Sequence, residues 1–188
     1  MMASRQNSRD AAQRVALCGL LTALMLVLGY IESMIPMGTI PGIKLGLSNG
    51  VLIFAIYMLG IPVAWALMVV KVVLSGLLFG GVSTMMYAFA GGVLSMLVMS
   101  LLSRVKDVHP VVVSITGGVA HNVGQVALAM LVLNTPKLIY YMAILMAVGF
   151  GCGLLTGVCA TAVMRHLKHI PGVRPRIPDP AEPARKEQ

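Results

Sequence analysis

Long apolar segments constrain this chain more than any other feature of its sequence. A helix needs about 20 mostly apolar residues to cross the hydrocarbon core of a membrane. Six segments meet this requirement, roughly 13–34, 44–60, 62–81, 84–103, 110–133 and 137–164. Of the 188 residues 58% are hydrophobic and 11% charged, whereas soluble domains carry about 25% charged residues. We therefore predict an all-α integral membrane protein whose domain, residues 13–164, is one six-helix bundle.

The distribution of positive charge predicts how this bundle is oriented. Of the 14 lysines and arginines, only Lys44, Lys71 and Lys137 lie outside residues 1–14, the connection 104–109 and the tail after 164. If the N-terminus is cytoplasmic, six crossings put all three basic regions in the cytoplasm, as the positive-inside rule requires. We predict a multi-pass protein of the cell membrane with both termini cytoplasmic. Because these charges form no single patch, the net charge of +8 does not indicate a nucleic-acid partner.

The two flanking segments carry no globular pattern. Residues 1–12 are predicted to be a short cytoplasmic segment, and no small-residue cleavage site follows the first apolar stretch. A retained first helix is therefore favoured over a removed signal peptide. The tail, 165–188, is basic and rich in proline, which predicts disorder. Its charge is suited to adhesion to anionic membrane lipid.

Small residues recur at helical spacing on three of the predicted spans. This spacing lets helices approach closely in lipid, where the hydrophobic effect gives little drive for association. Internal packing of the bundle and docking of another membrane subunit both fit the pattern. The residues are Gly149, Gly153 and Gly157 on the last span, Gly76 and Gly80 on the third, and Ala12, Ala16, Gly19 and Ala23 at the first.

A polar cluster interrupts the fifth span, where residues 117–127 read GGVAHNVGQVA. With about 3.6 residues per turn, His121 and Gln125 share one narrow face with Ser114, and Asn122 lies at its edge. Such groups can form hydrogen bonds between helices, worth roughly 0.6–2 kcal/mol per contact. They can also bind a ligand in the space that neighbouring glycines leave. Both interpretations are open at this point.

Charged residues are rare at membrane depth, where each one costs at least a few kcal/mol. Lys71 lies near the middle of the third span, Glu32 at the outer end of the first, and Lys44 at the start of the second. Glu32 can pair with either lysine. If it does not, the lysines are open to an anionic ligand, although Lys71 could also extend its stem towards the lipid interface.

The predicted outer connection, residues 33–43, reads SMIPMGTIPGI. Two prolines and two glycines exclude a regular helix throughout this stretch. A structured loop over an outward-facing cavity and an ordinary connector would both have this composition.

The sequence lacks the motifs of common membrane and nucleotide enzymes. It has no Asp-rich pair for Mg²⁺-diphosphate chemistry and no GxxxxGKS or GxxxxGKT loop for a nucleotide. The three cysteines match no metal-ligand spacing and are interpreted as packing residues. We therefore predict no cofactor, no metal site and no catalysis by this chain.

Three motifs together resemble the Gx transporter family, also catalogued as heptaprenyl diphosphate synthase component I. They are Glu32 before Pro36, PGIKLGLSN at 41–49, and GGVAHNVGQ at 117–125, and the resemblance covers roughly residues 14–164. That family is similar to the substrate-binding S components of energy-coupling factor transporters. The resemblance implies six helices, an external loop over the substrate, and a first helix with an AxxxA-type docking face, which Ala12 and Ala16 match. In such systems a scaffold membrane subunit and two cytoplasmic ATPases supply the energy.

Two functions follow as hypotheses. The first is capture of a small-molecule substrate, with an anionic group bound by lysines and other groups bound by amides and the imidazole. Its predicted site residues are Glu32, Lys44, Asn49, Lys71, His121, Asn122 and Gln125. The second is a non-catalytic membrane component of polyprenyl diphosphate or quinone synthesis, or of a membrane redox assembly. In that case the polar cluster would only join helices, and a separate chain would carry the catalysis.

Overall fold

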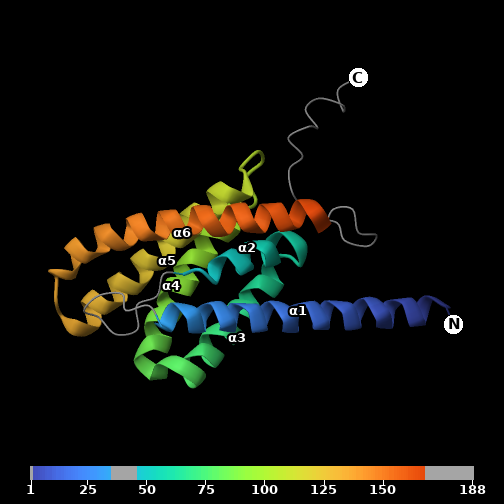
Figure 1. Ribbon diagram of the computed structural model, residues 1–188, viewed down its shortest axis with the longest axis horizontal. Coiled ribbons are helices and arrows are strands. Elements are labelled where there is room, and N and C mark those ends of the chain that lie inside the picture. The colour runs from blue at the N-terminus through green and yellow to red at the C-terminus, as the bar shows by residue number, and fades with distance from the viewer. Residues whose placement is uncertain (1, 35–45, 168–188) are drawn as a thin grey trace.

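The computed structural model describes residues 2–34 and 46–167, and these form an all-helical protein (Figure 1). The predicted helical class is therefore confirmed. The predicted outer loop, Lys44 and the predicted disordered tail beyond residue 167 lie outside the described residues. The elements are α1 (Met2–Met34), α2 (Asn49–Met58), α3 (Ile61–Ser75), the π-helical turn η1 (Gly76–Gly80), α4 (Gly81–Leu102), α5 (Pro110–Leu133) and α6 (Leu138–Leu167).

Four helical runs in the described chain are long and apolar enough to cross a membrane: Ala11–Met34, Ile61–Leu102, Pro110–Leu133 and Leu138–Leu167. The 42-residue run folds back at η1, so α3 and α4 lie side by side and antiparallel (Figure 1). Trp65 near the start of α3 donates to Ser100 near the end of α4, with 3.2 Å between Nε1 and Oγ. The run thus corresponds to the predicted third and fourth helices. The protein is a membrane helical protein with multiple long apolar helices.

The structure does not confirm the predicted second span, 44–60. Helix α2 has ten residues, which is about 15 Å at 1.5 Å per residue and about half of the hydrocarbon core. Its residues 49–57 are all buried within the protein, whereas a spanning helix at the edge of a bundle exposes one side to lipid. An unbroken apolar run suits both environments equally, so the sequence pattern could not separate them.

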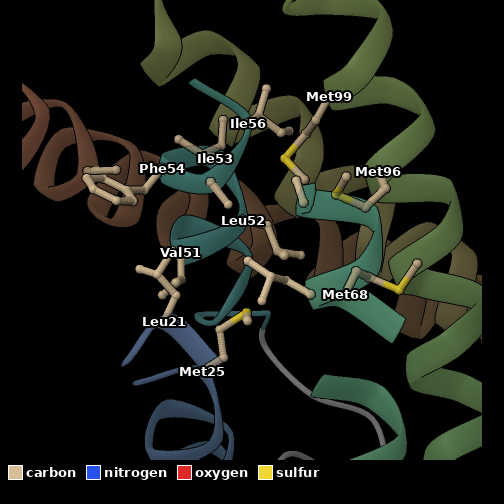
Figure 2. Packing of buried hydrophobic residues seen from close by; sticks show 14 of the residues in the cluster. Leu21, Met25, Val51, Leu52, Ile53, Phe54, Ile56, Met68, Met96 and Met99 are labelled. Atoms are coloured by element: carbon tan, nitrogen blue, oxygen red, sulfur yellow. The ribbon is translucent and has the colours of Figure 1, made fainter. Parts of the chain in front are cut away.

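Helix α2 is the centre of the largest hydrophobic cluster (Figure 2). Its Leu52 and Ile53 are completely buried. Side chains from the other five helices join this cluster, and several are methionines, whose flexible thioethers fill irregular gaps. Those drawn in Figure 2 include Leu21 and Met25 of α1, Met68 of α3, and Met96 and Met99 of α4.

Helices α5 and α6 approach so closely that their backbones touch at glycines. A Cβ atom added at Gly118 would lie 2.6 Å from the carbonyl oxygen of Gly149. One added at Gly153 would lie 2.7 Å from Cα of Ile115, and one at Gly157 would lie 2.7 Å from Cβ of Ser114. These distances leave no room for a methyl group. The predicted small-residue packing on α6 is therefore confirmed as contact within this chain.

The small residues of α1 behave differently. Ala12, Ala16, Gly19 and Ala23 are all exposed, and nothing lies within 4 Å of a Cβ atom added at Gly19. The N-terminal part of α1 also extends beyond the rest of the bundle (Figure 1). No part of the described chain covers this face.

The α5–α6 contact gives a direct stability prediction. Gly153→Ala should lower the free energy of unfolding by about 1–3 kcal/mol, because the new methyl group meets backbone that cannot move aside. Thermal unfolding of the purified protein in detergent measures the effect. Gly151→Ala is the matched control, since it lies on the same helix with nothing within 4 Å of its added Cβ atom. Equal unfolding midpoints for the two variants would contradict the packing described.

Candidate functional site

The junction between α1 and α2 is held by a buried carboxylate. Glu32, in the last turn of α1, is 4% exposed, and its Oε1 accepts the backbone N–H of Leu47. The carboxylate thereby lies close to the N-terminus of α2, where the helix dipole favours negative charge. Glu32 was predicted to bind substrate; the contact seen here is structural, and a role towards substrate stays a prediction.

The first backbone donors of α2 are also occupied. The N–H groups of Asn49, Gly50 and Val51 donate to the carbonyl oxygens three residues before them, at 2.9, 3.2 and 3.2 Å. Together with the Leu47–Glu32 bond, these contacts use the groups that would otherwise attract an anion to a helix N-terminus.

On α5, His121 and Gln125 form one polar unit. They are 2% and 0% exposed, and Nε2 of Gln125 lies 2.7 Å from Nε2 of His121. An amide nitrogen can only donate, so in this assignment the imidazole nitrogen accepts. The predicted sharing of one helix face is confirmed. Gly91 of α4 covers the pair, because a Cβ atom there would lie 2.6 Å from the His121 carbonyl oxygen and 2.7 Å from Cγ of Gln125.

Gly46 brings the start of α2 to this unit. Its φ of +83° is a backbone conformation that favours glycine. A Cβ atom at Gly46 would lie 3.0 Å from Nδ2 of Asn49 and 3.1 Å from Cδ2 of His121. Asn49 and His121, predicted to share a site, therefore both lie close to Gly46. Neither Gly46 nor Gly91 was predicted, although a glycine two residues before the polar pair Ser48–Asn49 was a signal for the first.

Asn122 points elsewhere. Its Nδ2 donates to the carbonyl oxygen of Leu145 on α6 at 2.6 Å. Ser114 also faces α6, with its Oγ 3.2 Å from Oγ1 of Thr156. The polar face predicted on α5 is thus divided: Asn122 and Ser114 join α5 to α6, while His121 and Gln125 face α4 and the start of α2. A ligand-binding role for Asn122 stays a prediction.

Of the two lysines predicted to bind substrate, Lys71 lies within the described residues and Lys44 does not. Lys71 is 6% exposed on α3, so its side chain does not extend along a lipid-facing surface. Whether it belongs to the Asn49–His121 site or pairs with Glu32 stays a prediction, and Lys44 lies outside the described residues. Residues 2–34 and 46–167 contain no group of three or more His, Cys, Asp or Glu that could hold a metal ion.

Comparison with known proteins identifies the family. Residues 21–163 match the sequence model of the family described as heptaprenyl diphosphate synthase component I. The chain belongs to this family. The match includes Glu32, Asn49 and the α5 polar residues, in agreement with the resemblance drawn from the motifs. Neither a search of curated proteins nor one of solved structures found a match.

The Glu32 contact predicts a measurable anchoring effect. Glu32→Ala should lower the free energy of unfolding by about 1–3 kcal/mol, because it removes a charged acceptor and leaves the Leu47 N–H without it. Thermal unfolding in detergent is the measurement. Ser33→Ala is the control, since Ser33 is exposed and its hydroxyl bonds only to Tyr30 in the same helix. The anchoring role is refuted if both variants unfold at the wild-type midpoint.

Proposed function

We propose that the chain is the membrane-embedded substrate-binding subunit of a small-molecule uptake transporter of the energy-coupling factor type. The observation that carries the proposal is the gathering of Asn49, His121 and Gln125 from two distant parts of the chain. All three are at most 3% exposed in a predominantly apolar bundle. Placing polar groups at this depth costs free energy. Hydrogen bonds to a bound polar solute would offset that cost.

The arrangement of the helices supports the orientation expected for such a subunit. The start of α1 and the end of α6 lie at the same end of the molecule (Figure 1). Both ends carry basic residues, so we place them in the cytoplasm. We further propose that the predicted second of six crossings, 44–60, includes α2. Substrate would then enter from outside.

The exposed face of α1 supports a partner in the membrane. Ala12, Ala16, Gly19 and Ala23 offer a flat surface on which a scaffold subunit can pack closely. Cytoplasmic ATPases bound to that scaffold would supply the energy, and this chain would carry no catalysis of its own. Lys44 and Lys71 would neutralise an anionic group of the substrate.

The family's description favours a second candidate. A non-catalytic membrane component of polyprenyl diphosphate synthesis would use the same exposed α1 face to bind a separate catalytic chain. Co-purification from membranes separates the two functions. Recovery of a scaffold protein with ATPase subunits supports uptake, whereas recovery of a prenyl diphosphate synthase chain in their place supports the second candidate.

Ligand binding tests the leading proposal directly. A thermal-shift screen of small polar metabolites should find compounds that raise the unfolding midpoint of the purified protein, because a ligand that binds only the folded state stabilises it. The double variant His121→Ala with Gln125→Ala should lose this stabilisation.

Thr116→Ala is the matched control for the double variant. Thr116 lies on the same helix, and its hydroxyl bonds only to the carbonyl oxygens of Val112 and Val113. It should retain ligand stabilisation. If the double variant also retains it in full, His121 and Gln125 are not part of the binding site.

A further inference from the structure

Asn49 is the polar side chain that the fold leaves least satisfied. It is 3% exposed, and within residues 2–34 and 46–167 neither its Oδ1 nor its Nδ2 has a hydrogen-bond partner. Ser48, directly before it, is completely buried, and its hydroxyl also lacks a partner there. A buried amide left in this state costs about 1–3 kcal/mol. Asn122 is equally buried and its Oδ1 also lacks a partner among the described residues, but its Nδ2 donates to Leu145, so burial alone does not explain the difference.

The unsatisfied amide of Asn49 lies near a second buried polar group, the imidazole of His121. Nδ2 of Asn49 and the ring of His121 are both about 3 Å from the position of a Cβ atom at Gly46. Any side chain at residue 46 would therefore press on both groups. Glycine at this position lets the Asn49 amide and the His121 ring lie close to the same point of the backbone.

The backbone at the start of α2 has no donors left over for an anion among those that the structure describes. The carboxylate of Glu32 lies one hydrogen bond from Leu47, two residues before Asn49. The backbone N–H groups of Asn49, Gly50 and Val51 already donate within the chain. A carboxylate or phosphate would find these backbone donors already occupied, whereas an uncharged amide needs only the one donor and one acceptor that the Asn49 side chain presents.

We propose that Asn49 recognises an uncharged amide edge of the substrate, in a primary carboxamide or a cyclic amide, with His121 beside it. An asparagine side chain presents a donor and an acceptor side by side, and another amide presents the complementary pair. This inference deepens the proposed uptake function and rests on it. Any anionic group of the substrate would bind elsewhere, towards the lysines.

The first test compares two buried asparagines in the full-length protein without ligand. Asn49→Leu removes an unsatisfied amide and should raise the unfolding midpoint by roughly 2–6 °C. Asn122→Leu removes an amide that bonds to α6 and should lower it. If Asn49→Leu is destabilised as strongly as Asn122→Leu, Asn49 is a structural residue and the inference is wrong.

The second test uses three probes of matched shape: benzamide, which has the amide edge, acetophenone, which only accepts, and benzoate, which is an anion. Saturation-transfer NMR with protein in nanodiscs should show benzamide binding preferentially. Asn49→Leu should weaken benzamide binding about tenfold and leave the weaker signals of the other two unchanged, which also controls for partition into lipid.

The outcomes separate this inference from the function on which it rests. Equal or stronger binding of benzoate or acetophenone at a site sensitive to His121→Ala would overturn the amide assignment while supporting a substrate site. Absence of binding by all three probes would also overturn the amide assignment. The uptake function would then be decided by the metabolite screen and by co-purification, neither of which uses these probes.

Discussion

The close packing of α5 on α6 is the interaction on which the rest of this structure depends. Close contact at Gly118, Gly149 and Gly153 fixes the orientation of α5 against α6, because main-chain atoms of one helix lie against glycines of the other. This orientation turns Asn122 towards α6 and leaves His121 and Gln125 on the side of α4 and α2. In lipid, where burial of apolar surface gives little drive between helices, such contact and the Asn122–Leu145 bond supply the association. The division of the α5 polar groups between the side facing α6 and the side facing α4 and α2 is a consequence of helix packing.

The short helix α2 completes the site because it is a buried element rather than a helix at the lipid boundary. Its apolar side chains fill the centre of the main hydrophobic cluster, and its polar start is brought to α5 through Gly46. Glu32 holds that start in place by accepting the Leu47 N–H. A carboxylate predicted to contact substrate can therefore also act through the backbone of the segment that presents Asn49.

Much of this arrangement could be predicted from sequence, because helix geometry acts locally. The span 110–133 coincides with α5, the glycine spacing on α6 reflects close packing, and His121 and Gln125 do share a face. The short α2 could not be predicted, because apolar residues have the same pattern whether lipid or protein surrounds them. The contacts at Gly46 and Gly91 depend on which helices become neighbours, and local periodicity contains no information on that.

The central claim is that α5–α6 packing directs Asn122 to α6, whereas Asn49, beside His121, binds a ligand as proposed. Side-chain ¹⁵N chemical shifts of Asn49, Asn122 and His121, recorded in nanodiscs before and after adding a ligand from the metabolite screen, test it most directly. The account predicts that the Asn49 and His121 signals move on binding while that of Asn122 does not. Movement of the Asn122 signal with unchanged Asn49 and His121 signals would contradict it.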